Sequence, residues 1–170
     1  NSMVYHIGLG VGVPYLNSTI LPFEKRYYGG GANSVRGWSA RSLGPGSYNA
    51  GTTIDYMKQS GDIKLDLNLE YRTKLVWLLE LAAFIDAGNI WTLKDEGQAG
   101  GQFKFDKFYE QIALGYGIGI RLNFDYFVLR LDWGIKAFDP SRGDGERWRF
   151  VPGWNILKDT ALHFAVGYPF

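Results

Sequence analysis

Ile63-Lys64-Leu65-Asp66-Leu67-Asn68-Leu69-Glu70-Tyr71 is the stretch that decides the fold, because apolar and polar residues alternate along it without a break. A period of two places successive side chains on opposite faces of a β-strand. One face of this strand is therefore hydrocarbon, and the other carries charged and amide groups. The fold has to give each face a suitable environment.

The same alternation recurs along most of the chain. Bulky aliphatic and aromatic residues lie on one face of each segment, and glycine, carboxylates, amides and arginine lie on the other. No segment shows a convincing helical period, so we expect no helix of any length. The expected strands span about residues 3–16, 62–75, 76–91, 109–124, 126–138 and 160–170.

Two all-β folds use strands with a single apolar face. A soluble sandwich or lipocalin-like barrel turns that face inward, whereas a membrane barrel turns it outward to lipid. The strands here run to about 11–15 residues, against a soluble mode of about 5–6. Aromatic residues sit at their ends, where the two interfacial girdles of a membrane barrel lie. The sequence therefore predicts a transmembrane antiparallel β-barrel, with charges and glycine facing the lumen.

The connections between the strands show the asymmetry of outer-membrane barrels, in which short turns lie on one side and long loops on the other. Six strands cannot close by themselves, since such barrels start at about eight. We therefore expect further strands before residue 1, or pairing of the sheet edges with another copy. The short connections lie near residues 74–76 and 123–126, and the long ones at about 17–61, 92–108 and 138–160.

Composition excludes several classes of function. The 170 residues hold 18 Lys and Arg against 17 Asp and Glu, and a net charge of +1 gives no basic field for nucleic acid. The chain has no cysteine, which rules out disulfides, thiolate zinc sites and cysteine nucleophiles. We expect no metal and no cofactor.

Some local patterns resemble functional motifs without their context. Gly8-x-Gly10-x-Gly12 and Gly115-x-Gly117-x-Gly119 lack the spacing and the following helix of a dinucleotide loop. Asp139 to Glu146 contains Arg-Gly-Asp and several carboxylates, but not the ligand spacing of a calcium loop, so a solvated loop is the better interpretation. His6 and His163 have no serine or carboxylate beside them in sequence, so we expect no enzyme.

The long connection over residues 17–61 is too rich in aromatic residues and arginine for plain disorder. Folding back into the lumen would bury its aromatic side chains and explain the glycines on neighbouring strands. An arginine carried into the lumen needs carboxylate partners. The candidates at lumen-facing positions are Asp66, Glu70, Asp86 and Asp132.

Two motifs give the chain a family resemblance. Val35-Arg36-Gly37-Trp38 resembles the VRGF/Y motif, and Phe84-Ile85-Asp86-Ala87-Gly88 resembles the F-x-D-x-G strand motif, of the BamA/TamA outer-membrane superfamily (bacterial surface antigen domain). Order and spacing agree along the whole chain. The details are most similar to TamA-like and BamA-like proteins of the Bacteroidetes.

This resemblance implies a 16-stranded outer-membrane barrel preceded by periplasmic POTRA domains, with this chain as its last six strands. It implies that Arg36, at the tip of the lumen loop, pairs with Asp86, and that Glu70 is a second partner. The implied function is assembly, insertion or translocation of other outer-membrane or exported proteins. The implied partners are a lipid bilayer, client proteins and accessory assembly subunits.

The end of the chain resembles the β-signal by which outer-membrane barrels are recognised. Pro169 departs from the usual pattern, and proline prefers a strand edge because it cannot donate to a ladder. The alternating residues of this signal are Phe164, Val166, Tyr168 and the terminal Phe170.

Three other functions stay open at this level. A two-partner-type secretion pore and the barrel anchor of a lipase share the superfamily, and the sequence upstream of Asn1 would separate them. A passive porin belongs to a different class, and it predicts that Arg36 is dispensable for the barrel.

Overall fold

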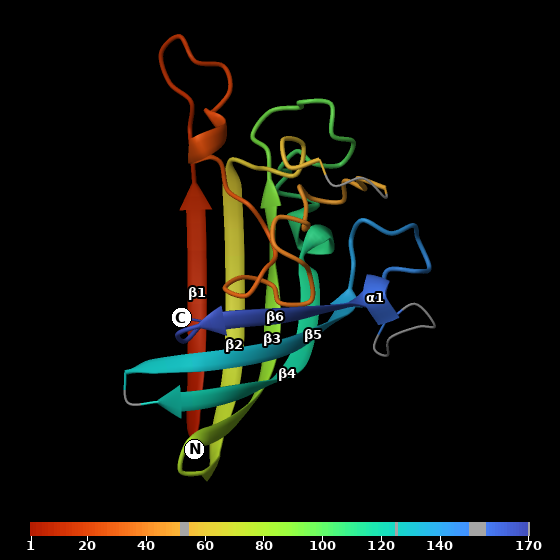
Figure 1. Cartoon of the computed structure of the whole chain (residues 1–170). Coiled ribbons are helices and arrows are strands. Elements are labelled where there is room, and N and C mark those ends of the chain that lie inside the picture. The colour runs from red at the N-terminus through yellow and green to blue at the C-terminus, as the bar shows by residue number, and fades with distance from the viewer. Residues whose placement is uncertain (52–54, 125, 150–155, 170) are drawn as a thin grey trace.

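Six antiparallel strands form one sheet, in which each strand pairs with the next along the chain (Figure 1). The computed structural model describes residues 1–51, 55–124, 126–149 and 156–169. This sheet confirms the all-β antiparallel fold. The strands are β1 (Ser2–Val11), β2 (Ile63–Val76), β3 (Leu79–Trp91), β4 (Ala113–Phe124), β5 (Phe127–Phe138) and β6 (Thr160–Val166).

Helical structure among the described residues is confined to short turns. These are η1 (Phe23–Lys25), η2 (Phe108–Gln111) and α1 (Ile156–Asp159). The sequence predicted no helix, and α1 differs from that expectation by a single turn. In the described parts of the chain, no helix is both long and apolar enough to cross a bilayer.

The strand register keeps the alternation in phase across the sheet. Asn68 lies opposite Asp86, and Asp86 lies opposite Gly115 on the next strand. Polar and small residues therefore share one face, which we call the inner face, and the bulky apolar residues share the outer face. Ile7, Ile85 and Ile118 of the outer face are 72%, 58% and 61% exposed.

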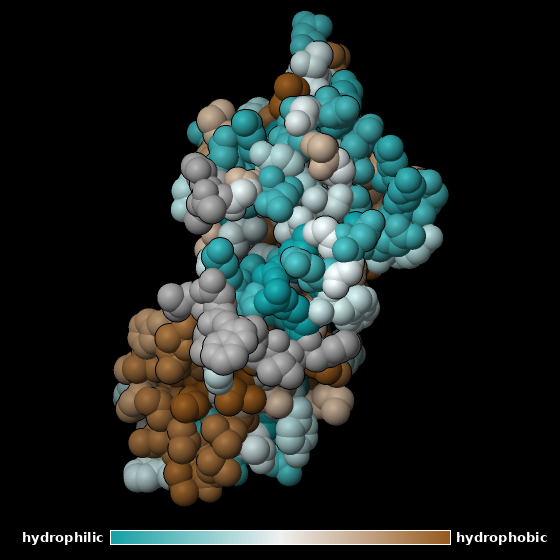
Figure 2. Space-filling model, turned by 90° about the vertical axis from the view of Figure 1, so that its right-hand side faces the viewer, coloured by the Kyte–Doolittle hydropathy of each residue, from teal (hydrophilic) through white to brown (hydrophobic). Residues whose placement is uncertain are grey.

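Hydrophobic surface gathers over the strands, and hydrophilic surface over the long connections. Figure 2 shows the hydrophobic area in the lower part of the molecule and the hydrophilic area in the upper part. In Figure 1 the connections that follow β1 and β3 lie at the upper end, whereas the two-residue turn between β2 and β3 lies at the lower end. The surface is thus divided as expected of a chain that crosses a bilayer with its strands.

Three strand ends differ from the sequence-based bounds by four or five residues, and the start of β3 differs by three. β1 ends at Val11 and not near residue 16, because Pro14 has no N–H to donate to a ladder, although the Gly12 N–H still donates to the Asp62 carbonyl at 2.7 Å. β4 begins only at Ala113, since the preceding residues form η2. β6 ends at Val166, because Gly167 turns the chain with a φ of 96°.

The connection between β1 and β2 folds back against the inner face of the sheet. Figure 1 shows it in orange, returning from the upper end past β2 and β3. Val35, Trp38 and Leu43 from this connection pack with Ala113 of β4 into a small buried apolar cluster. Hydrogen bonds and ion pairs also join the connection to the sheet.

Candidate functional site: the anchored loop

Arg36 lies at the centre of the contact between the loop and the sheet. Its side chain is fully buried, although it carries a charge. The Nε and Nη2 groups donate to Asp86 Oδ2 and Oδ1, each at 2.8 Å, and the Arg36 backbone N–H donates to Asp86 Oδ2 at 3.0 Å. One carboxylate of β3 therefore fixes both the side chain and the backbone of the loop tip.

A second carboxylate and an aromatic ring also bind the guanidinium of Arg36. Arg36 Nη1 donates to Glu70 of β2, and Asp132 Oδ2 of β5 lies 3.9 Å from the same nitrogen. The ring of Phe84 lies beneath the guanidinium carbon, which is 3.6 Å from the ring centroid. A planar cation over an aromatic face, with carboxylates at its rim, uses the geometry specific to arginine.

The negative charges around Arg36 offset the cost of burying its own positive charge. Burial alone would lower the pKa of the Arg36 guanidinium. The hydrogen bonds and negative charges of Asp86 and Glu70 outweigh burial, so the pKa is raised above its ordinary value. The charged form of Arg36 is therefore the one that its buried partners stabilise.

Further arginines on the inner face tie the carboxylates to one another. Arg121 of β4 donates to Glu70 Oε2 at 3.0 Å and to Asp132 Oδ1 at 2.5 Å. Arg72 of β2 donates from Nε to Glu70 Oε1 at 2.7 Å. Glu70 therefore accepts from three arginines. Removing one member leaves buried charges without their full set of partners.

Polar residues beside Arg36 hold the loop backbone. The Ser34 hydroxyl donates to Asp66 Oδ1 at 2.5 Å. The Asn68 amide donates to the Ser34 carbonyl at 2.8 Å and to Asp86 Oδ1 at 2.9 Å. β2 thus contacts the loop at every inner position between Asp66 and Glu70.

Glycines on β5 and β4 make room for the loop and for the ring of Phe84 beneath it. A Cβ on Gly134 would collide with the Arg36 carbonyl, and a Cβ on Gly117 would lie 2.6 Å from the ring of Phe84. The Arg36 carbonyl is 3.0 Å from His163 Nε2 of β6, so this ring nitrogen carries the proton and donates. Residues of β2, β3, β5 and β6 therefore all contact the loop tip.

The structure brings together most of the residues that the sequence singled out inside the barrel. Val35 and Trp38 lie in the apolar cluster, and Gly37 lies against the backbone of β5 at Ile135. A Cβ on Gly88 of β3 would lie 2.2 Å from the Leu65 carbonyl oxygen of β2 and 3.2 Å from Val35 Cγ2, so glycine here makes room for the neighbouring strand and for the loop. Asp66 accepts from Ser34 and pairs with Lys64 at 3.0 Å, so it binds no arginine of the loop.

The C-terminal residues divide into two groups. Phe164 and Val166 lie on the outer face and are 70% and 66% exposed. Tyr168 does not continue this row, because the turn at Gly167 carries its ring to the Arg72 guanidinium, 4.5 Å from the ring centroid. Phe170 lies outside the described residues.

Sequence reasoning missed several residues of the site. Arg121, Asn68 and Ser34 were not predicted as site residues, and the contact of His163 with the loop was not predicted either. The alternation does place Arg121 and Asn68 on the polar face. Their partners, however, depend on strand register and on the path of the loop, for which the sequence carries no local signal.

The chemistry of the site is that of an anchor. Its groups are arginines, carboxylates and amides that pair mainly with one another, although Asn68 Oδ1, Arg121 Nε and Asp132 Oδ2 have no hydrogen-bond partner among the described residues. No cluster of three or more histidine, cysteine or acidic residues that could hold a metal occurs among the residues described. What the arrangement can do is fix one loop against four strands.

Known proteins share the sequence pattern and the fold of this chain. The Omp85 superfamily domain model matches residues 1–157. The outer membrane protein assembly factor BamA of Neisseria meningitidis serogroup B is 33% identical over 89 residues, which are 49% of this chain and 11% of that protein. The crystal structure of BamA from Haemophilus ducreyi lacking POTRA domains 1–3 covers 97% of this chain and 31% of its own, with a TM-score of 0.60 and 15% identity. The latter likeness shows the fold alone.

Proposed function

The chain belongs to the Omp85 superfamily, and on that premise we propose that it is the C-terminal part of a barrel that assembles, inserts or translocates other outer-membrane proteins. The family consists of outer-membrane β-barrel proteins of Gram-negative bacteria, which gives the location. The chain spans only about a tenth of the length of the curated relative, 11%, so further strands and POTRA domains belong to this proposal.

The observation that carries the proposal is the loop anchored on the inner face. Arg36 and Trp38 occupy the space between β2 and β5 that a passive porin would keep open to water. A passive pore also needs no buried ion-pair network. A barrel whose wall opens during assembly, by contrast, is stabilised by a loop that contacts four strands. The same observation favours assembly over the porin alternative.

The mechanism we propose needs no bond chemistry. An edge strand offers unpaired N–H and C=O groups, so it can act as a template for an incoming β-hairpin. The anchored loop would keep the inner wall in register while the seam of the barrel opens. Client proteins, the bilayer and accessory assembly subunits are the partners in this proposal.

The test is a double-mutant cycle on the anchor. We expect Arg36→Ala to lower barrel stability by about 3–5 kcal/mol, since it leaves the buried carboxylates of Asp86 and Glu70 unpaired. Asp86→Ala should cost a similar amount, and the double variant should cost less than the sum of the two. Heat-modifiable gel migration reports the stability of the barrel, and client levels in the outer membrane report its activity.

Matched variants keep this test specific. Arg41→Ala removes an arginine of the same loop that is exposed and lies over the ring of Tyr28, so it should behave as wild type. Arg36→Lys keeps the charge but loses the bidentate geometry, so it should recover only part of the function. Wild-type client levels in a stably folded Arg36→Ala variant would contradict the proposed role of the loop.

A further inference from the structure

The loop between β1 and β2 is held by a second group of hydrogen bonds, apart from those of Arg36. Residues 44–47, which we call the returning limb, lie against the end of β3 and against the connection over residues 92–112 that joins β3 to β4. The Gly46 N–H donates to the Ile90 carbonyl at 2.8 Å, and the Ser47 N–H donates to the Gly100 carbonyl at 3.1 Å. The returning limb is thus bonded to a strand and to a neighbouring connection.

Asn89 of β3 is the centre of this group, and its side chain is buried. Its Nδ2 donates to the Gly46 carbonyl at 2.9 Å and to the Gln111 carbonyl at 2.5 Å. Its Oδ1 accepts from the Ile90 N–H at 2.8 Å. Both hydrogens of the amide are therefore used, one for the returning limb and one for the last residue of η2.

Gln111 extends the same group with its own side chain. Its Nε2 donates to the Gly100 carbonyl at 2.9 Å and to Ser47 Oγ at 3.4 Å. Its Oε1 accepts from the indole N–H of Trp91 at 2.8 Å. The two amides therefore bond the returning limb, β3 and the β3–β4 connection to one another. We call this group the upper anchor, and its members are Gly46, Ser47, Asn89, Gly100 and Gln111.

The backbones at the upper anchor come too close for side chains. A Cβ on Gly46 would lie 2.2 Å from the Gly100 carbonyl oxygen, and a Cβ on Gly44 would lie 2.5 Å from Asn89 Oδ1. Such close approach leaves no room for water between the two connections. A carbonyl that lost its donor here would stay buried without a partner, which is costly.

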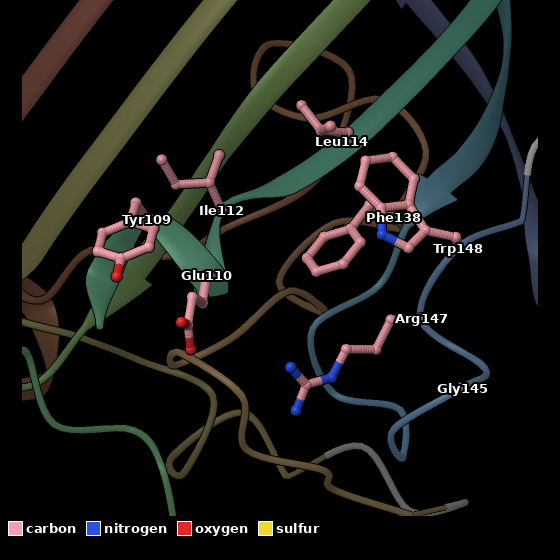
Figure 3. A pocket seen from close by; sticks show the side chains of 8 residues that line it. All are labelled: Tyr109, Glu110, Ile112, Leu114, Phe138, Gly145, Arg147 and Trp148. Carbon is pink, nitrogen blue, oxygen red and sulfur yellow. The ribbon is translucent and has the colours of Figure 1, made fainter. Parts of the chain in front are cut away.

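On its other side, the β3–β4 connection faces a hollow of about 550 Å³. Figure 3 shows Tyr109, Glu110 and Ile112 on the side of η2, and Arg147 and Trp148 on the side of the connection that follows β5. The hollow separates these two connections, so η2 is not packed along this side. The hydrogen bonds that fix the end of η2 come from the upper anchor.

Two further contacts join the loop to the β3–β4 connection. Arg26 of the loop pairs with Glu96, and its side chain is almost completely buried. The Gln98 amide donates to the Lys58 carbonyl at 3.4 Å. The loop and this connection are therefore bonded at three separate places, although they are separated in the sequence by β2 and β3.

We propose that Asn89 and Gln111 are positioning residues, which keep the returning limb and the β3–β4 connection together as one unit while the barrel works. The inference rests on the proposed assembly function and adds a second point at which the loop is fixed. Arg36 fixes the tip of the loop to the inner face with ion pairs. The upper anchor fixes the returning limb with hydrogen bonds between neutral groups.

A disulfide measures this contact directly. The 170 residues contain no cysteine, and a Cβ on Gly100 would lie 3.5 Å from Ser47 Cβ, which is within the range of disulfides, about 3.5–4.5 Å. We expect Ser47→Cys with Gly100→Cys to form a disulfide in the purified full-length protein at equilibrium with a glutathione buffer. Ser47→Cys with Gly97→Cys is the control, because Gly97 also has a positive φ, but a Cβ there would meet nothing within 4 Å.

Removing the donors of Asn89 should weaken this disulfide. We expect Asn89→Ala to lower the equilibrium constant of its formation about tenfold. Asn89→Asp keeps the volume but has no N–H, so it should lower the constant at least as much, whereas a role in packing alone would leave the constant unchanged. Gln111→Glu removes the donor to the Gly100 carbonyl and tests the same anchor if an Asn89 variant does not fold. Heat-modifiable migration shows which variants are folded.

Equal constants in the wild-type background and in every folded variant would overturn the upper anchor. A disulfide that is equally stable in the Gly97 control pair would overturn it as well, because the contact would then not be specific. Neither result depends on client levels, so both are distinct from a failure of the proposed function.

The activity of the cross-linked protein tests whether the unit stays together during assembly. In a reconstituted assembly assay, the oxidised Ser47→Cys, Gly100→Cys variant should be as active as the same variant after reduction. Loss of activity on oxidation that reduction restores would overturn the inference, because the returning limb and the connection would then have to separate. Inactivity of the wild type would count against the assembly function, and the disulfide equilibrium would still decide the contact.

Discussion

Arg36 illustrates, at the scale of one residue, how a buried charge can be held in place. Three of its side-chain nitrogens donate to carboxylates, its backbone N–H donates to the same Asp86 oxygen as Nε, and its carbonyl accepts from His163. Lysine has neither the planar fork nor the ring contact with Phe84. Both the backbone and the side chain of Arg36 are thus bound by the sheet at one site.

Gly134 is the second residue whose identity the anchor requires. Gly134→Ala would push a methyl group into the Arg36 carbonyl. Backbone cannot rearrange cheaply, so we expect a loss of about 1–3 kcal/mol in barrel stability, as for other overpacked sites. The midpoint of urea unfolding, followed by gel migration, measures this loss.

Gly143→Ala is the control for Gly134→Ala, because a Cβ there would meet nothing within 4 Å. It should leave the midpoint unchanged. A Gly134→Ala variant as stable as Gly143→Ala would mean that the loop tip does not rest on β5 in the membrane.

At the scale of the element, each strand is defined by its two faces. The outer face of β4 is apolar along its whole length, and its inner face carries Ala113, three glycines, Arg121 and Asn123. The glycines make room for the loop and for the ring of Phe84. The amphipathic pattern of the strand therefore serves the bilayer on one side and the anchor on the other.

Ile118→Arg tests the lipid-facing role of β4. Ile118 is 61% exposed and lies in the middle of the strand. An arginine at the bilayer midplane of a barrel costs about 2–4 kcal/mol, so we expect a loss of that size in the unfolding free energy measured in lipid vesicles. Phe105→Arg, at a position that is 83% exposed in the connection before β4, should cost far less. Equal losses would place Ile118 outside the hydrocarbon region.

The faces of the strands could be predicted from the sequence, because alternation follows from the local geometry of an extended chain. The asymmetry of the connections could be predicted in the same way. The ends of β1 and β6 depend on Pro14 and on the positive φ of Gly167. A single proline or glycine in the sequence predicts the exact end of a strand only weakly. The family resemblance implied the pairing of Arg36 with Asp86. The residues alone gave four carboxylates as candidate partners of a loop arginine and did not choose among them.

At the scale of the whole molecule, strand β6 is part of the sheet and also carries residues of the proposed recognition signal. Phe164 and Val166 lie in the same outer row as Leu162. If they are read as a signal, Phe164→Ser and Val166→Ser should lower the amount of barrel inserted into the outer membrane several-fold, whereas Leu162→Ser should lower it much less. Fractionation and gel migration measure inserted barrel.

Equal losses for the three serine variants would mean that lipid contact alone explains the row. Tyr168 belongs to a different interaction, because its hydroxyl accepts from the Asn123 amide at 3.2 Å and its ring lies over Arg72. Any effect of substituting Tyr168 would therefore arise from its contacts with Asn123 and Arg72 on the inner face.

The hydrogen bond between His163 and the Arg36 carbonyl joins residues that are 127 positions apart. His163 reaches that carbonyl only when β6 has paired with β5, since the register of this pair sets its place opposite Asp132. Contacts of such long sequence separation form late in folding, after the loop entropy has been lost. The loop tip therefore gains this partner only after β6 has paired with β5, so a fully bound loop requires that this strand pair has formed.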